Sequence, residues 1–125
     1  MLLATDLIVS YGKIRALDGL SAGFRPGAFT ALVGPNGCGK STCLRAAMGL
    51  LPLGGGEVTL DGVPVAAIGR RALARRIAYL PQESHCPDYM TLGDLIELAG
   101  YARYALFGGP SDRDRELFRD ALDTV

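Results

Sequence analysis

Residues 34–42, with the sequence GPNGCGKST, constrain the fold of this chain more than any other feature. They satisfy the G-x-x-x-x-G-K-[ST] pattern of a phosphate-binding loop, or P-loop. The apolar run FTALV at 29–33 precedes the loop, and the helix-forming run TCLRAAMGLL follows it. A short, almost wholly apolar run suits a strand buried on both faces of a parallel sheet. The order of strand, glycine-rich loop and helix therefore predicts an α/β fold with an anion site at the loop.

The backbone of this loop is suited to phosphate. Gly34, Gly37 and Gly39 allow backbone conformations that a side chain would forbid, so phosphate oxygens can approach the main chain. Successive N–H groups then point inward, and the helix that begins near Lys40 adds the positive end of its dipole. We expect a nucleotide to contact the whole loop, which comprises Gly34, Pro35, Asn36, Gly37, Cys38, Gly39, Lys40, Ser41 and Thr42.

Three side chains of the loop carry the expected chemistry. The Lys40 ammonium would extend over the β- and γ-phosphates, which makes it a catalytic candidate as well as a ligand. The Ser41 hydroxyl would ligate Mg²⁺, a hard cation suited to oxygen ligands. Thr42 would contact the α-phosphate or cap the helix. The alternative interpretation is an ordinary glycine-rich turn.

Composition limits the partners that the chain can attract. Thirteen Lys and Arg balance thirteen Asp and Glu, so the net charge gives no long-range attraction to nucleic acid or anionic lipid. No apolar run approaches the roughly 18 to 20 residues needed to span a bilayer, and no cleavable signal opens the sequence. We expect neither a nucleic acid partner nor direct membrane insertion. Cys38, Cys43 and Cys86 lack metal-ligand spacing and are odd in number, which favours reduced thiols in a cytoplasmic protein.

Short strands dominate the front of the chain and helices its end. We expect strands at 2–9, 17–24, within 54–63 and at 77–80, with turns at 11–13, 26–27 and Asp61-Gly62. Helices are expected after the P-loop as far as Gly49, at 70–76, at 92–101 and from 111 to 122. The last two begin with capping boxes, Thr91 to Asp94 and Ser111 to Asp114.

Three blocks together resemble the ABC ATPase family: YGKIRALDGLSAGFRPGAFTALVGPNGCGKST, GGEVTLDG and RRIAYLPQE. The resemblance runs along nearly all of the chain and implies ATP and Mg²⁺ as cofactors. It implies an α/β fold, namely a P-loop NTPase core with an N-terminal antiparallel β-subdomain and the beginning of a helical subdomain. Residues 1–87 would form the β-subdomain and P-loop core, and residues 88–125 would start the helical subdomain. The chain would be the N-terminal part of one ABC ATPase domain.

The resemblance adds two residues to the expected site. Tyr11 matches the family's aromatic residue that stacks on adenine, a role that suits its flat apolar ring; the alternative is a tyrosine packed at a strand edge. Gln82 matches the family's Q-loop glutamine, a catalytic and metal-contacting position whose amide oxygen reaches Mg²⁺ or the attacking water. The alternative is a polar loop residue. His85 does not match the family's switch histidine, and we expect it to be a solvated loop residue.

Within the family, the stretches LARRIAYLPQE and TLGDLIELAGYARYALF look most like ATPases that energise import of iron-siderophore, haem or cobalamin complexes. Such relatives show Gly-Arg and then Pro-His after the helix, whereas this chain has Gly100-Tyr-Ala-Arg103-Tyr104-Ala. The resemblance implies integral membrane permease subunits and a second ATP-binding subunit, as a homodimer, for partners. It implies a peripheral place on the cytoplasmic face of the cell membrane. Alternatives are a non-transport ABC ATPase acting on DNA or ribosomes, and a nucleotide-binding module without catalysis.

Several family elements match nothing in these 125 residues. The signature loop, the Walker B aspartate, the adjoining catalytic glutamate, the dimer-contacting loop and the switch histidine would all follow residue 125. Hydrolysis in the family occurs at a head-to-tail dimer that needs those elements. We therefore expect no significant turnover from these residues alone.

Overall fold

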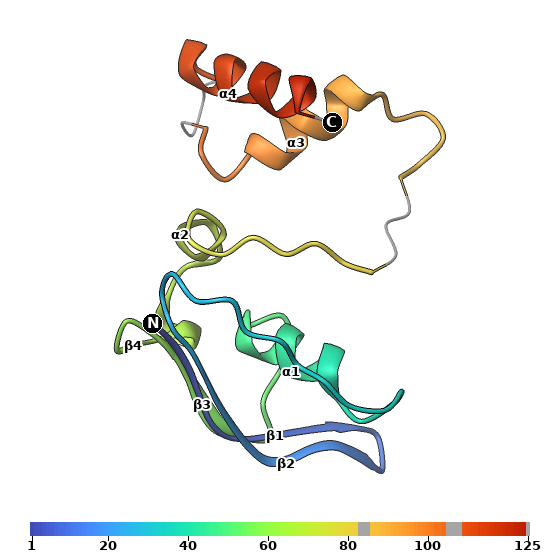
Figure 1. Cartoon of the computed structure of the whole chain (residues 1–125), viewed down its shortest axis with the longest axis vertical. Coiled ribbons are helices and arrows are strands. Elements are labelled where there is room, and N and C mark those ends of the chain that lie inside the picture. The colour runs from blue at the N-terminus through green and yellow to red at the C-terminus, as the bar shows by residue number, and fades with distance from the viewer. Residues whose placement is uncertain (83–85, 105–108, 125) are drawn as a thin grey trace. The chain divides into compact units, whose positions relative to one another are not determined.

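A computed structural model describes residues 1–82, 86–104 and 109–124. These residues form two compact units, Met1–Gly69 and Arg70–Val125; the first holds the strands together with one α-helix, and the second holds helices (Figure 1).

The first unit is built on a four-stranded antiparallel sheet in the order β2-β1-β3-β4. Its strands are β1 (Leu2–Tyr11), β2 (Ile14–Phe24), β3 (Gly55–Leu60) and β4 (Val63–Pro64). These elements confirm the strands expected near the start of the chain and within 54–63, and extend the first two. A 3₁₀ turn, η1 (Val65–Ala67), follows β4 and buries Val65.

A bulge in β1 sets which of its side chains enter the core. Ala4, Leu7 and Val9 are all buried, although strict alternation would place Ala4 and Leu7 on opposite faces. The register with β2 shifts between these two residues, and Asp6 adopts a positive φ of 49° there. The Asp6 N–H donates to Ser21 Oγ at 2.9 Å, which satisfies the donor that the bulge frees from the ladder. The bulge thus returns Leu7 to the core face.

The turn that joins β3 to β4 follows directly from its two residues. Asp61 and Gly62 have φ values of 51° and 80°, the positive pair that a type I′ hairpin turn needs. Leu60 pairs with Val63 across it. The turn expected from Asp61-Gly62 is therefore confirmed.

Helix α1 (Lys40–Ala47) covers the sheet through a small apolar face. Cys43, Ala46 and Ala47 are buried, at the spacing that places residues on one side of a helix. Burial also raises the pKa of the Cys43 thiol. The helix ends at Ala47, two residues before the expected Gly49; the Gly49 N–H donates to Ala46 O and the Leu50 N–H donates to Arg45 O, both at 2.9 Å.

Two expected strands are absent from the described structure. Residues 29–33 lie in no strand, and Phe29 and Val33 are 97% and 89% exposed. Residues 77–80 also lie in no strand, and Leu80 is 89% exposed. A buried parallel strand needs hydrogen-bonding neighbours on its edges and helices over its faces. No strand of the described sheet pairs with either run. Apolar composition is therefore not sufficient for these residues to form strands.

The second unit contains three helices in its described part, α2 (Arg70–Ala74), α3 (Leu92–Gly100) and α4 (Asp112–Asp123). They confirm the helices expected from the sequence, within one or two residues at the ends of α3 and α4. Gly100 brings α3 close to α4, because a Cβ there would lie 2.4 Å from Phe118 Cζ and from Tyr104 Oη. Within the described residues, no helix combines the length and the apolar character that crossing a membrane requires.

Both longer helices begin with the capping boxes that the sequence predicts. The Asp94 N–H donates to Thr91 Oγ1 at 3.1 Å, and the Thr91 N–H donates back to Asp94 Oδ2 at 2.9 Å. Ser111 and Asp114 repeat the arrangement at the start of α4. Hydrogen bonds from the Thr91 side chain and backbone lower the pKa of Asp94, and those from Ser111 lower the pKa of Asp114.

Because of these two carboxylates, we expect α3 and α4 to lose stability at acidic pH. A lowered pKa in the folded state means that each carboxylate adds stability above its ordinary pKa and loses it as the pH falls through the lowered value. Far-UV circular dichroism should therefore lose helical signal as the pH falls below about 4. Asp94→Asn with Asp114→Asn should flatten that acid limb, and Asp88→Asn should not. An acid limb of unchanged size in the double variant would contradict this origin.

Candidate functional site

The P-loop is fixed on one side by strand β2. Gly39 has a φ of 95°, and a Cβ there would lie 2.8 Å from the Ala16 carbonyl oxygen and 3.0 Å from Leu17 Cδ2. A side chain at this position would clash with the backbone of β2. It would also make the positive φ of residue 39 unfavourable. Glycine at position 39 therefore lets the start of α1 lie directly against the sheet.

Lys40 closes the loop on the other side. Its Nζ donates to Gly34 O at 2.8 Å and to Pro35 O at 2.6 Å, and lies 3.8 Å from Cys38 Sγ. Gly34 has a φ of 156°, and a Cβ there would lie 2.8 Å from the same sulfur. The ammonium thus holds the first residues of the loop over the first turn of α1.

The N-terminal end of α1 has the electrostatic character of an anion site. Gly39 supplies no side-chain cap, and the first turn carries no acidic residue. The free N–H groups and the dipole of a helix start both favour negative charge, and the Lys40 ammonium adds a full positive charge. Ser41 is exposed in this turn and Thr42 is half-buried, so the Ser41 hydroxyl is accessible to a cation that accompanies phosphate. Asn36 and Gly37 lie exposed in the same loop.

The structure brings only some of the expected residues into contact. Tyr11 belongs to the same unit as the P-loop, lies at the end of β1 opposite Ile14, and is 48% exposed. Gln82 is exposed and belongs to the second unit. The roles of both residues remain predictions. His85 lies outside the described residues.

Sequence patterns missed the part of β2 that supports the loop. Ala16 contributes a carbonyl oxygen and Leu17 a buried side chain against Gly39, yet neither was among the expected site residues. The only signal that could have found them is the alternation of β2, which places Leu17 on the core face. Their contribution depends on strand pairing, which a local pattern does not reveal.

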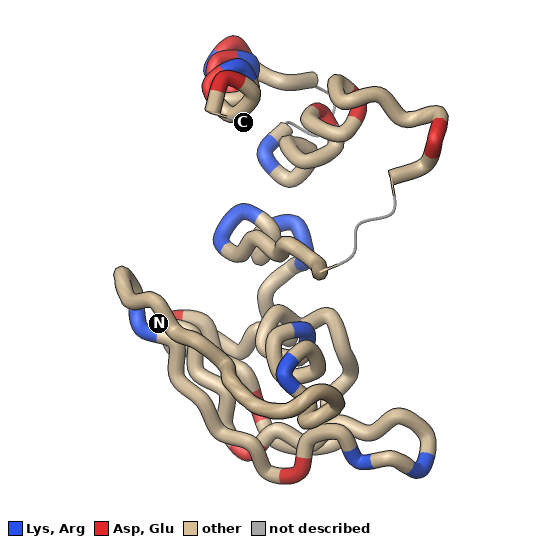
Figure 2. Tube along the Cα trace, turned by 45° about the vertical axis from the view of Figure 1, so that its right-hand side comes forward, with Lys and Arg blue, Asp and Glu red and all other residues tan. Residues whose placement is uncertain are grey.

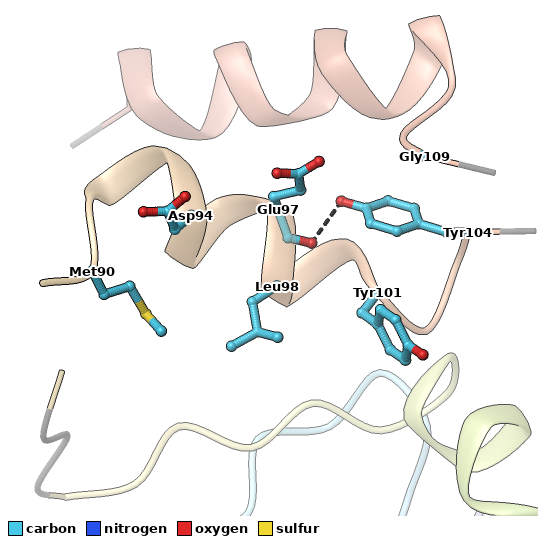
Figure 3. A pocket seen from close by; sticks show the side chains of 7 residues that line it. All are labelled: Met90, Asp94, Glu97, Leu98, Tyr101, Tyr104 and Gly109. Carbon is cyan, nitrogen blue, oxygen red and sulfur yellow. Dashed lines mark hydrogen bonds between the residues drawn. The ribbon is translucent and has the colours of Figure 1, made fainter. Parts of the chain in front are cut away.

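A second concave feature lies in the helical unit. A hollow of about 420 Å³ is formed by Met90, Asp94, Glu97, Leu98, Tyr101, Tyr104 and Gly109 (Figure 3). Its rim includes the exposed side chains of Leu98 and Tyr101. Buried Tyr104 donates its hydroxyl to Glu97 O at 2.6 Å, which keeps this end of α3 folded. Desolvation raises the pKa of that hydroxyl, and the charges of Glu97 and Asp114 add to the effect.

Solved structures place this architecture among ATP-binding cassettes. A structure of the ATP-binding subunit of an ABC transporter aligns with a TM-score of 0.71 and 29% identity, covering 82% of this chain and 42% of the other. The dimeric structure of MJ0796, a bacterial ABC transporter cassette, aligns with a TM-score of 0.79 and 25% identity, covering 98% and 55%. The fold and the loop thus define a cassette of the P-loop class. They confirm the expected fold class, including its antiparallel β-subdomain and its incomplete domain.

Sequence comparisons then identify the family. The model of the ABC transporter family matches residues 17–125, and the chain belongs to that family. The ferric enterobactin transport ATP-binding protein of Escherichia coli (strain K12) is 35% identical over 120 residues, which are 96% of this chain and 44% of that protein. A cobalamin import ATP-binding protein of Halobacterium salinarum is 37% identical over 121 residues, covering 94% and 30%. A manganese transport system ATP-binding protein of Listeria innocua is 36% identical over 121 residues, covering 95% and 48%.

These relatives confirm the resemblance to ATP-binding subunits of importers. The chain spans less than half of the length of each of the three. ATP binding, its hydrolysis, the solute and the partners of the whole protein are accordingly matters for proposal.

The contact at Gly39 predicts a specific loss of nucleotide binding. Gly39→Ala should weaken ATP binding at least about ten-fold, because the new Cβ would push the loop away from Ala16 and strain the backbone. Gly27→Ala is the matched control, since Gly27 also has a positive φ, 68°, but a Cβ there meets no atom within 4 Å. Calorimetric titration with ATP measures both variants. Equal affinities for the two would show that the contact with β2 does not shape the loop.

Proposed function

We propose that this protein is the ATP-binding subunit of an ABC importer, in which ATP binding and hydrolysis drive solute uptake. The observation that carries the proposal is the Lys40 ammonium, held at the start of α1 in a P-loop that rests on β2. The importer ATPases among its relatives support the transport part of the proposal. Iron-siderophore, haem and cobalamin complexes are the solutes that we propose.

The P-loop residues divide the work of binding ATP. The N–H groups at the start of α1 and the Lys40 ammonium would bind the β- and γ-phosphates, and Ser41 would ligate the accompanying Mg²⁺. Tyr11 would stack its exposed ring on adenine. Gln82 would approach Mg²⁺ or the attacking water. Mg²⁺ supplies charge neutralisation for the leaving phosphate, while these side chains bind and orient.

We expect residues 1–125 and the whole protein to differ in ATPase activity. Residues 1–125 by themselves would bind ATP without turning it over, because the proposed general base belongs to family elements that these residues do not match. A second ATP-binding subunit would complete the catalytic site in the whole protein. The dimeric structure of MJ0796 supports a dimer as the working form.

We place the contact with the membrane partner on the second unit. The hollow of Figure 3 presents two apolar side chains, Leu98 and Tyr101, that are 58% and 67% exposed. Exposed apolar side chains around a concavity are typical of a protein interface. A segment of a permease subunit would cover them, which keeps the subunit peripheral on the cytoplasmic face of the membrane.

The first test measures ATP binding. Wild-type protein should bind Mg²⁺-ATP, and Lys40→Ala should weaken that binding on the order of ten- to a hundred-fold, because it removes a charged hydrogen-bond donor to the phosphates. Arg25→Ala removes the same unit of charge from an exposed residue beyond β2 and should bind as wild type does. ATPase activity measured on residues 1–125 should be absent. Wild-type protein without ATP affinity would overturn the proposed function, and turnover by these residues would place a base among them.

A second test concerns the partner. Affinity-tagged full-length gene product, expressed in its native cells, should co-purify with an integral membrane protein that mass spectrometry identifies as a permease. Leu98→Asp with Tyr101→Asp should reduce the recovered permease at least about five-fold, since burying the two introduced carboxylates against an apolar partner is costly. Leu3→Asp, on the β-subdomain, is the matched control. Recovery of RNA or DNA in place of a membrane protein would favour a non-transport ABC ATPase.

A further inference from the structure

The hollow of Figure 3 contains two carboxylates and, among the described residues that line it, no basic side chain. Asp94 and Glu97 supply the carboxylates, and the other described lining residues are uncharged. These two are the only charged residues of α3, so the helix is marked in red alone in Figure 2. Residues three positions apart are neighbours on a helix surface, so the two negative charges reinforce each other. The hollow therefore attracts a cation.

The described part of the chain does not neutralise either carboxylate. Both ion pairs found there lie in the first unit. Asp94 Oδ2 accepts hydrogen bonds from the Thr91 N–H and hydroxyl, which are neutral donors and leave its charge in place. Glu97 is exposed, and its carboxylate accepts no hydrogen bond from a described residue, because Tyr104 bonds to its backbone oxygen instead.

The arginine nearest to the hollow, Arg71, is occupied by other acceptors. Its guanidinium lies 5.8 Å from the centre of the Tyr101 ring, which lines the hollow. Its Nε and Nη2 donate to the backbone oxygens of Ala102 and Tyr104 in the turn after α3. Arg71 forms no ion pair with either carboxylate. A cation that neutralises the hollow would therefore come from another molecule.

Apolar side chains lie beside the two charges. Leu98 and Tyr101 point toward one edge of the hollow, and the carboxyl groups of Asp94 and Glu97 lie toward the opposite edge (Figure 3). Lysine and arginine have the matching form, since each carries a charged end on an apolar stem. The ring of Tyr101 can also attract a cation through its face.

We propose that the hollow receives a lysine or arginine side chain from the permease segment that covers it. The stem of this side chain packs on Leu98 and Tyr101, and its cationic end pairs with Glu97, while Asp94 adds its charge. The proposal rests on the proposed function, which supplies a permease as the partner, and it specifies the chemistry of the contact. A segment without a basic residue would bury the Glu97 carboxylate unpaired, which is strongly unfavourable.

Recovery of the permease with affinity-tagged full-length gene product tests the pairing. Glu97→Gln should lower the recovery about three- to ten-fold, and Glu97→Lys should lower it further because like charges would then meet. Both variants keep the backbone oxygen that Tyr104 uses. Glu116→Gln is the matched control, since Glu116 is exposed on α4 and does not line the hollow. It should leave the recovery unchanged. Wild-type recovery with Glu97→Lys would overturn the proposal.

A charge exchange identifies the basic residue of the permease. With Glu97→Lys in the ATP-binding subunit, each lysine and arginine in the cytoplasmic loops of the recovered permease is replaced in turn by glutamate. One exchange should restore recovery to within about two-fold of the wild-type complex, because two residues in direct contact compensate each other. A complete set of exchanges without any restoration would show that no basic side chain pairs with Glu97.

ATP titration of the same samples separates this proposal from the proposed function. Both Glu97 variants should bind Mg²⁺-ATP with wild-type affinity, because Glu97 lies outside the P-loop. Equal recovery of the permease by wild-type protein and by both variants would overturn the pairing and leave the proposed function intact. Wild-type protein that recovers no permease would overturn the transport function, and the pairing with it.

Discussion

The close approach of Gly39 to the carbonyl oxygen of Ala16 is the contact on which the first unit depends. It sets the start of α1 against β2, and the small buried face of Cys43, Ala46 and Ala47 then lets the rest of the helix follow the sheet. Close packing of α1 on the sheet requires both the small side chains on its buried face and the glycine at its start. A larger side chain on that face, or a Cβ at position 39, would push the helix away from the sheet. The phosphate loop has its shape because both of its ends are held by that arrangement.

The two units are stabilised by different means. The first is built on an apolar core between a sheet and one helix, while Tyr104 is the one buried apolar side chain among the described residues of the second. Capping boxes, an arginine contact to a carbonyl group of the turn after α3 and the tight crossing at Gly100 stabilise the second unit instead. Polar contacts of this kind are individually weak and partly exposed, so local opening is easier there than in a packed core. That property suits a unit proposed to respond to a partner.

Local chemistry made part of this structure predictable from sequence. The Asp61-Gly62 turn, the capping box at Thr91 and, within two residues, the end of α1 were predicted, and each depends on residues within five positions of one another. The runs 29–33 and 77–80 were predicted as strands from their apolar composition and are not strands in the described sheet, because pairing partners decide that outcome. The support that Ala16 gives the loop was missed for the same reason. The P-loop pattern identified the site, but the residue that shapes it comes from a strand that ends before the pattern begins.

The hydrogen bonds of Lys40 have a thermodynamic consequence for any phosphate that enters the loop. The ammonium already donates to Gly34 O and Pro35 O, so a phosphate exchanges one set of acceptors for another and gains only the difference between them. A singly charged anion offers little more than two carbonyl oxygens do, whereas a triphosphate with several charged oxygens offers much more. The carbonyl groups of the loop therefore compete with a ligand for the Lys40 ammonium. Only a ligand with enough negative charge to outcompete them binds tightly.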